Sequence, residues 1–180
     1  MMKELDKITT QRAIKGDKKA FKALYDFYAP YIWRVLIKMS ADEQIARELL
    51  QDTFIRVHKS LNKFKCESAL STWIYRIAFN VGMLHFKKQK VLKRHDPFQD
   101  TIRDKRHDSY ETREIIEKVM SEITQEERFL LTAKEVDGMS FDELAEITGI
   151  TSGTLRTRLH RLKEKIRSRF SEKEPLEVLA

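Results

Sequence analysis

Polar side chains recur at helical spacing between residues 152 and 161. Leu155 and Leu159 fall on one face of such a helix, so the opposite face is expected to be exposed. Arginine can read guanine edges in the major groove of DNA, and threonine or histidine can contact bases or phosphates. The pattern therefore predicts a DNA-contacting face made of Ser152, Gly153, Arg156, Thr157, Arg158, His160 and Arg161, flanked by the phosphate-binding candidates Lys163, Arg167 and Arg169.

A second stripe of this kind lies near the middle of the chain. An arginine, an asparagine and a lysine follow one another at helical spacing, which suits an amide reading a base edge between cations on phosphates. The loop before the stripe could accept an extruded base, and its lone Cys66 is expected to be a small buried hydrophobe rather than a reactive thiol. The predicted DNA-binding residues are Arg76, Asn80, Met83, Lys87 and Lys88 on the helix, and Phe64, Lys65 and Cys66 in the loop.

An acidic surface interrupts the basic first half of the chain. An exposed isoleucine among carboxylates and amides is typical of a protein-binding helix, with an apolar centre and a polar rim. Its alternative is a wider core-facing stripe packed under another helix. The predicted partner-binding residues are Ile45, Glu48, Leu49, Gln51, Asp52 and Ile55, with Gln44 on the same face.

Helices must position all three surfaces, because no run of alternating apolar and polar residues is long enough for a strand. In the first half, Asp17 begins one helix and Pro30 fits the first turn of another. Ser40 and Glu43 have capping-box spacing and begin a third helix that reaches about Leu61. After a loop over 62–71, a long helix is expected over about 71–91, with Trp73, Ile74, Ile77, Val81 and Leu84 facing the core.

In the second half, helices are expected at about 109–121, 125–136, 141–148 and 152–170. Ser140 caps the third of these helices, Gly149 ends it, Ile150 fills the turn and Thr151 caps the next helix, which together predict a helix-turn-helix. The alternative, an ordinary basic surface helix, explains the cations but not the capped helix and glycine turn before them. The apolar pattern is lost between Lys93 and Asp108, which reads as a linker.

Composition agrees with two small helical domains. The 180 residues include only five Gly and three Pro, too few for the turns of an all-β fold. Residues 1–95 carry a net charge of +11, residues 96–150 carry −8 and residues 151–180 carry +4, which favours two polyanion-binding surfaces. A single cysteine excludes an intramolecular disulfide. We expect an all-α protein with domains at 8–93 and 109–171 joined by a flexible linker at 94–108 and followed by a frayed tail.

Three segments together resemble the extracytoplasmic-function (ECF) sigma factors of the sigma-70 superfamily. The run from Ala46 to Phe54 resembles the helix of region 2 that binds the polymerase clamp. The run Ser71-Thr72-Trp73-Ile74-Tyr75-Arg76-Ile77-Ala78-Phe79-Asn80 resembles the segment that reads and opens the −10 element. The run from Gly153 to Leu162 resembles the recognition helix of region 4, which reads the −35 element. The resemblance covers about 20–170 and leaves no room for region 3.

The resemblance implies a transcription-initiation factor without enzyme activity, cofactor, metal or small-molecule substrate. Glu48, Gln51 and Asp52 would dock on the β′ clamp of core RNA polymerase and region 4 on the β flap. The two basic surfaces would then engage promoter DNA together, with melting by capture of an extruded base. An anti-sigma factor is an implied partner and could hold the protein at the inner membrane face. With no signal peptide or apolar run of about 18 residues, we expect a cytoplasmic protein, bound to the nucleoid when active, without membrane insertion.

Two other classes of protein compete with this interpretation. A dimeric activator or repressor could carry the same helix-turn-helix behind a sensor domain, but the acidic face and the basic tryptophan-bearing helix fit it poorly. An enzyme is the third class. The five histidines form no zinc-binding HExxH pair, and the chain has no phosphate-cradling glycine loop or nucleophile elbow.

Overall fold

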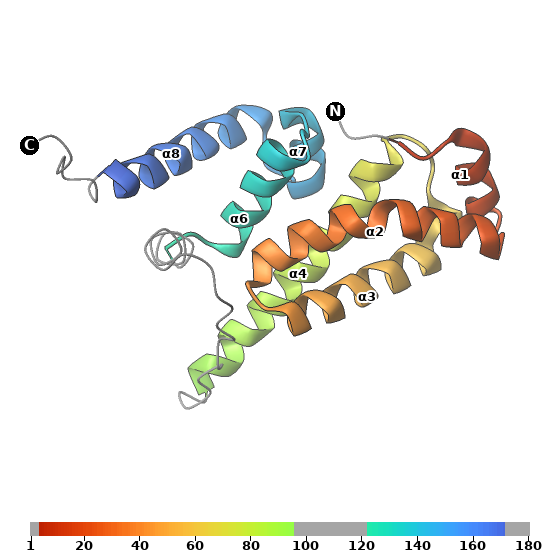
Figure 1. Ribbon diagram of the computed structural model, residues 1–180, viewed down its shortest axis with the longest axis horizontal. Helices are drawn as coiled ribbons and strands as arrows, with labels where there is room; N and C mark the ends of the chain where they lie inside the picture. The colour runs from red at the N-terminus through yellow and green to blue at the C-terminus, as the bar shows by residue number, and fades with distance from the viewer. Residues whose placement is uncertain (1–3, 96–121, 172–180) are drawn as a thin grey trace, which may run out of the picture.

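The computed structural model describes residues 4–95 and 122–171, with side chains described to residue 91 in the first segment and residue 168 in the second. Every regular element in these two segments is helical, which confirms the predicted all-α fold (Figure 1). The expected linker from residue 96 onward, the helix at 109–121 and the tail from residue 172 lie outside the described residues.

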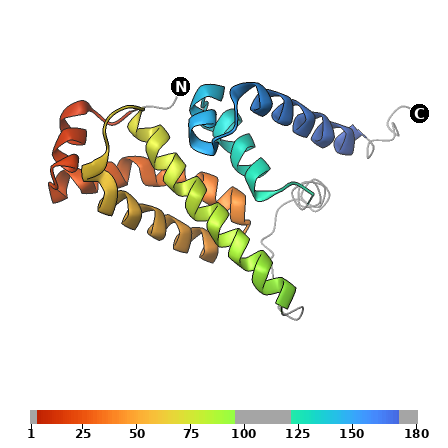
Figure 2. The same ribbon diagram turned by 180° about the vertical axis from the view of Figure 1, so that it is seen from behind.

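The first domain contains α1 (Lys7–Ile14), α2 (Lys18–Ser40), α3 (Glu43–Ser60), the 3₁₀ turn η1 (Leu61–Lys63) and α4 (Leu70–His95). Helices α2 and α3 lie side by side and α4 packs against both of them (Figures 1 and 2). The approach of α4 to α2 is close at Gly82, where an added Cβ would lie 2.8 Å from the Cε atom of Met39. The N-terminal segment is tied to this bundle, because Tyr28 donates a 2.9 Å hydrogen bond to Glu4.

Two expected helix starts in this domain were wrong. Pro30 lies inside a continuous α2 rather than at the start of a new helix. Proline removes one backbone donor, but Tyr28 and Ile32 on either side are fully buried, so core packing carries the helix through. Ser40 is the last residue of α2, and Asp42 caps α3 by accepting a 2.8 Å hydrogen bond from the backbone N–H of Ile45.

The second domain contains α6 (Gln125–Leu131), the π-helical turn η2 (Thr132–Val136), α7 (Phe141–Thr148) and α8 (Ser152–Ser171). Thr124 and Ser140 form complete capping boxes with Glu127 and Glu143. Gly149 ends α7 with a φ of +75°, the left-handed conformation that glycine adopts without strain. The predicted helix-turn-helix is therefore confirmed over α7 and α8.

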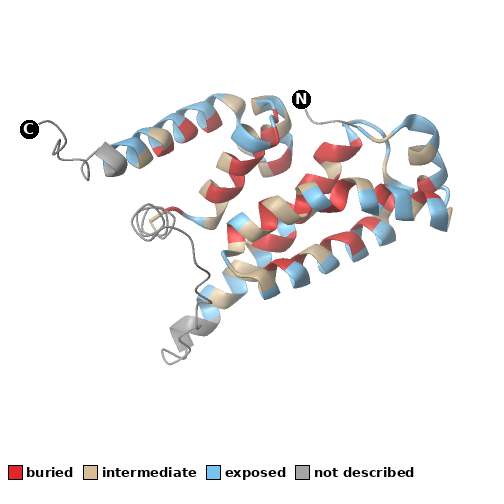
Figure 3. Ribbon diagram, viewed as in Figure 1, coloured by how far each residue is buried: buried red, intermediate tan, exposed pale blue. Residues whose placement is uncertain are grey.

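The two domains pack against each other: α6 lies on α2, and α7 lies on α4. Phe129 of α6 is fully buried, with its ring centroid 4.8 Å from that of Phe79 and 6.4 Å from that of Tyr75. In Figure 3 the three helices at this contact, α2, α4 and α6, all carry buried residues. The expected core face of α4 was partly wrong, because Leu84 is 42% exposed whereas Tyr75 and Phe79 are buried against the second domain.

Candidate DNA- and protein-binding surfaces

The turn before α8 fixes the N-terminal end of this helix. The hydroxyl of Ser152 donates a 2.6 Å hydrogen bond to Asp142 of α7, and the hydroxyls of Thr151 and Thr154 lie 2.9 Å apart. Three leucines of α8 are buried against the rest of the domain, so its polar face is held outward: they are Leu155, Leu159 and Leu162. A rigidly held, outward-facing helix of this kind is suited to a DNA groove.

Ion pairs with carboxylates reduce the number of free cations on the basic face of α8. Arg158 lies 3.2 Å from Glu126, Lys163 lies 2.8 Å from Glu135, and Arg167 pairs with Glu164. The side chain of Arg169 lies outside the described residues. Cations held by carboxylates are less available to phosphates. What remains on the predicted DNA face is a strip of exposed side chains that make no ion pair with any described residue: Arg156, His160 and Arg161.

Two residues of this face, Arg156 and Thr157, are placed by neighbours within the domain. The guanidinium of Arg156 lies 5.3 Å from the ring centroid of Phe141, close enough for a cation–π contact. Thr157 donates its hydroxyl hydrogen to the backbone oxygen of Gly153 at 3.2 Å. Apart from the adjoining residues and the backbone of α8 itself, no atom lies within 4 Å of where a Cβ of Gly153 would stand, so the start of the strip is open for close approach of a ligand.

Only part of the predicted DNA-binding stripe on α4 is exposed to solvent. Asn80, Lys87 and Lys88 are exposed and Met83 is half-buried. Arg76 lies beside the second domain, with its Nη2 atom 3.7 Å from a carboxylate oxygen of Glu146 on α7. Its Nε atom is buried and has no hydrogen-bond partner among the described residues. The loop before α4 carries exposed Lys65 and a Phe64 ring that packs 5.1 Å from the ring of Trp73.

Cys66 in that loop is exposed, so the expectation of a buried cysteine was wrong. Its φ of +55° lies in the left-handed region, which residues other than glycine rarely adopt.

The predicted partner-binding face of α3 is mostly at the surface. Glu48, Gln51 and Asp52 are exposed, Ile45 is half-buried and Ile55 is 42% exposed. Leu49 does not belong to this face: it is 2% exposed, because it points into the bundle between Ala46 and Thr53 on the same side of α3. The amide of Gln44 donates a 2.9 Å hydrogen bond to Glu48, which keeps this carboxylate on the outer face.

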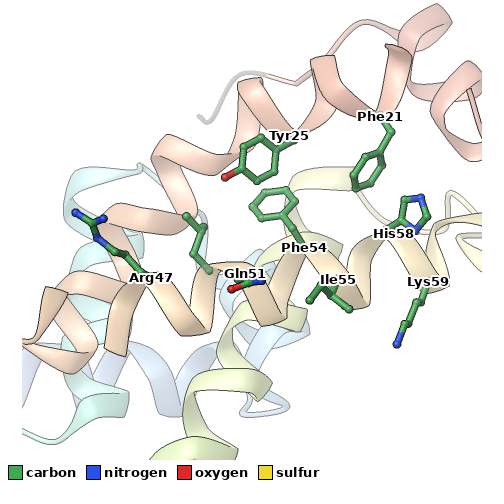
Figure 4. Close-up of a pocket in the computed structure, with 9 residues that line it drawn as sticks. Phe21, Tyr25, Arg47, Gln51, Phe54, Ile55, His58 and Lys59 are labelled. Carbon is green, nitrogen blue, oxygen red and sulfur yellow. The ribbon is translucent and has the colours of Figure 1, made fainter. Parts of the chain in front are cut away.

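A groove of about 500 Å³ runs beside this face, between α2 and α3. Figure 4 shows aromatic rings along it, Tyr25 beside Phe54 and Phe21 beside His58, with Gln51 and Ile55 on its α3 side. The two pairs of rings meet edge-on, with centroids 4.7 and 4.8 Å apart. Sequence reasoning missed the α2 wall, because helical spacing does not show which aromatic residues of this helix line a surface groove.

A buried carboxylate links the two domains. The side chain of Asp137, directly after η2, is 0% exposed, and it accepts hydrogen bonds from Arg34 of α2 at 2.5 Å and Tyr75 of α4 at 2.8 Å. Burial raises the pKa of this carboxyl, while its two partners act in the opposite direction. Burial also raises the pKa of Tyr75, which therefore stays a neutral donor. No local sequence pattern marks this site, because Tyr75 and Arg34 lie 62 and 103 residues from Asp137.

Within the described residues, no group of three or more His, Cys, Asp or Glu side chains is arranged to hold a metal ion. No helix there is both long enough and apolar enough to cross a membrane.

Two family models match the chain. Sigma-70 region 2 matches residues 24–91, and Sigma-70 region 4 matches residues 113–166. Among curated proteins, the RNA polymerase sigma-H factor of Pseudomonas aeruginosa is 27% identical, covering 92% of this chain and 94% of its own. The ECF RNA polymerase sigma-E factor of Haemophilus influenzae is 26% identical, covering 92% and 95%.

Solved structures agree on the fold. The sigma factor RpoE, in complex with the anti-sigma factor NepR from Bartonella quintana, superposes with a TM-score of 0.71 at 19% identity, covering 87% of this chain and 99% of its own. CnrH, in complex with the cytosolic domain of CnrY, gives a TM-score of 0.70 at 18% identity, covering 94% and 99%. With both sigma regions in order on a wholly helical frame and relatives matched over nearly their full length, the chain belongs to the ECF group of sigma-70 factors and serves RNA polymerase in transcription initiation.

Proposed function

We propose that this chain brings core RNA polymerase to promoters through three separate surfaces: α3 binds polymerase, α8 reads the −35 element and α4 with its preceding loop engages the −10 element. The observation that supports this division most directly is the sign of the exposed charge. Exposed carboxylates at Glu48 and Asp52 stand on α3, which also carries the exposed cations Arg47, Arg56 and Lys59. The exposed charges on the outer half of α4 are all cations among the described residues, and those of α8 are cations except Glu164. Carboxylates repel DNA phosphates and favour a basic protein partner.

The polymerase-binding surface joins the acidic face of α3 to the groove beside it. Ile55 and Gln51 line the groove, and Glu48 and Asp52 lie on the same helix outside it. A partner helix with an apolar side chain between basic residues would fill the groove and pair with the carboxylates. The β′ clamp is the proposed partner for α3, and the β flap for the second domain.

The DNA-binding surfaces divide the work of promoter recognition. On α8, Arg161 and His160 are placed to meet base edges, and Arg156 is held near Phe141. On α4, Asn80 stands exposed between Arg76 and Lys87, with the Phe64–Cys66 loop before it to hold an unpaired base. Neither element need bind tightly, because one polymerase complex carries both surfaces. No covalent chemistry is required, so the protein is proposed to act without enzyme activity. Its proposed location is the cytoplasm, and an anti-sigma factor is proposed as a further partner.

Run-off transcription tests this function. The purified chain is added to core RNA polymerase on a pool of promoter fragments from the source genome, and core polymerase without the chain is the control. Discrete transcripts that appear only with the chain, and that vanish with Glu48→Lys plus Asp52→Lys, are the expected result. Transcription equal to that of core polymerase alone on every fragment would reject the proposal.

A further inference from the structure

The segment before α2 contacts both ends of the loop that precedes α4. This loop spans residues 64–69, between η1 and α4. At its first end, helix α1 lies against η1 (Figures 1 and 2). At its second end, a carboxylate oxygen of Glu4 accepts a 3.4 Å hydrogen bond from the backbone N–H of Ser71, in the first turn of α4. Residues 4–14 therefore bridge the two ends of the loop, and we call them the N-terminal brace.

A buried tyrosine of α2 fixes the position of Glu4. Tyr28 is fully buried, and its hydroxyl donates a 2.9 Å hydrogen bond to Glu4 and accepts one of 3.2 Å from the backbone N–H of Leu5. Burial raises the pKa of this hydroxyl, which therefore stays a neutral donor. A side chain of α2 thus holds the first residues of the brace at the start of α4.

Glu4 supplies an acceptor that the start of α4 lacks in its own sequence. The first backbone N–H groups of a helix have no partner within the helix, and a polar side chain at the N-cap usually accepts from one of them. The N-cap of α4 is Ala69, whose carbonyl accepts a 3.1 Å hydrogen bond from Trp73 but whose side chain has no acceptor. The first turn contains no acidic residue either. The carboxylate of Glu4, 67 residues from Ser71 in the sequence, therefore stabilises the positive end of this helix.

Holding both ends restricts the shapes that the loop can adopt. The loop is irregular, and Cys66 within it has the uncommon left-handed φ of +55°. Phe64 at its start is packed, with its ring centroid 5.1 Å from that of Trp73. A loop with free ends samples many conformations and must be ordered when it takes up a ligand, which lowers affinity. The brace removes part of that cost before a base arrives.

We infer that Glu4 is a positioning residue for base capture: through Tyr28 and Ser71, the N-terminal brace holds the loop at 64–69 in the shape that accepts an unpaired base of the −10 element. This inference rests on the proposed −10 function of the loop. Glu4 acts only through the backbone at the start of α4, because its carboxylate would repel the phosphates of bound DNA.

Hydrogen exchange in the full-length chain tests whether Glu4 orders the loop. Glu4 is exposed, so Glu4→Ala removes the carboxylate without leaving a cavity in the core. Asp26→Ala is the matched control, because it removes an exposed carboxylate from the same domain. We expect the amides at 64–72 to exchange about fivefold faster in Glu4→Ala and at the wild-type rate in Asp26→Ala, with helix content unchanged by circular dichroism. Equal exchange of this segment in both variants would overturn the inference.

Promoter opening by the holoenzyme tests whether the ordered loop captures a base. Each variant is combined with core RNA polymerase, and opening is compared on promoters that carry each of the four bases at every position of the −10 element. With Glu4→Ala, we expect the preference at the position whose base enters the loop to fall about threefold or more, because the loop must now be ordered on binding. Preferences at the other positions and the affinity for polymerase should be kept, and Asp26→Ala should match the wild type throughout.

Tyr28→Phe is the second variant, because it removes only the hydroxyl that holds Glu4. It should lower the same preference, and adding it to Glu4→Ala should cause little further loss, since both changes break one tether. An equal loss of opening with every base at every position would mean that Glu4 only stabilises the domain, which contradicts a role in base capture. If the wild-type holoenzyme itself shows no base preference in the −10 element, the proposed function of the loop fails. A wild-type preference that Glu4→Ala leaves intact rejects the role of Glu4 alone.

Discussion

The hydroxyl of Tyr75 on α4 donates a 2.8 Å hydrogen bond to the carboxylate of Asp137, 62 residues further along the chain. Both side chains are buried. Tyr75→Phe removes the donor without changing the shape of the ring and leaves Asp137 with one partner. We expect the free energy of unfolding of the full chain to fall by about 1–3 kcal/mol, the usual cost of an unsatisfied buried group, measured by urea denaturation. Tyr25→Phe, with a half-exposed ring, is the control and should change it by less than about 0.5 kcal/mol. An equal effect of both variants would contradict the role given to Tyr75.

The buried carboxyl of Asp137 also predicts that the stability of the folded chain depends on pH. Burial raises the pKa of its carboxyl in the folded chain above the ordinary value of 3.8. Between pH 3.8 and the raised pKa, the folded state therefore binds more protons than the unfolded state. Its contribution to stability is therefore fully present below 3.8 and is lost as pH rises through the raised pKa. Over that window Tyr75 stays a neutral donor, because burial raises its pKa.

Denaturation of wild type and Asp137→Asn across this pH range measures that contribution. The amide keeps one of the two acceptor oxygens that Arg34 and Tyr75 use and has no proton to exchange, so the difference in unfolding free energy between the two proteins should change in favour of wild type as pH falls. A difference that is constant with pH would show that the carboxyl titrates as an ordinary aspartate.

The acidic face of α3 predicts the effect of charge reversal on polymerase binding. Glu48→Lys and Asp52→Lys should each weaken binding to core RNA polymerase about tenfold or more, equivalent to about 1.4 kcal/mol, because each replaces an attraction by a repulsion. Both side chains are exposed, so helix content should be unchanged. The control Asp26→Lys reverses an exposed carboxylate on α2. Fluorescence titration with core polymerase makes the comparison, and equal affinities for all three variants would reject α3 as the contact.

The ion pairs on α8 predict a difference between neighbouring arginines. Arg161→Ala should cost about 1–3 kcal/mol at the −35 element and relax the preference for one base pair. Arg158→Ala should cost less, because Arg158 is held 3.2 Å from Glu126. Binding of both variants to a randomised −35 library measures cost and preference together. If Arg158→Ala lost more affinity than Arg161→Ala, or if Arg161→Ala weakened binding to all sequences equally, a different side of α8 would contact the bases.

Local signals predicted most of the elements. The Ser140 capping box and the glycine at 149 placed α7 and the turn correctly, because capping depends on residues only a few positions apart. The same logic failed at Ser40, where a hydroxyl and a carboxylate had the right spacing but Asp42 lay nearer the true helix start. It failed again at Pro30, where burial on both sides outweighed a local preference.

The contacts between domains could not be predicted from periodicity. The spacing on α4 identified apolar residues but not which of its two apolar sides meets the bundle, so Leu84 was assigned inward and Phe79 was overlooked. The Asp137 network joins residues far apart in sequence, and no local pattern marks them. The ion pairs of Arg158 and Lys163 could not be predicted from periodicity either, because their partners Glu126 and Glu135 lie on other helical elements.

The central claim is that α4 opens promoter DNA, and Asn80 tests it most directly because it is exposed in the middle of the stripe. Permanganate footprinting compares wild type and Asn80→Ala, each with core polymerase, on a promoter and on the same promoter with mismatches across the −10 element. We expect Asn80→Ala to bind polymerase normally but to open the matched promoter poorly. The mismatched template should restore most of the signal, because the cost of unstacking (about a few kcal/mol) has been removed. Equal opening of matched DNA by both proteins would contradict the role of α4, and no polymerase-dependent opening by wild type on any promoter would contradict the whole account.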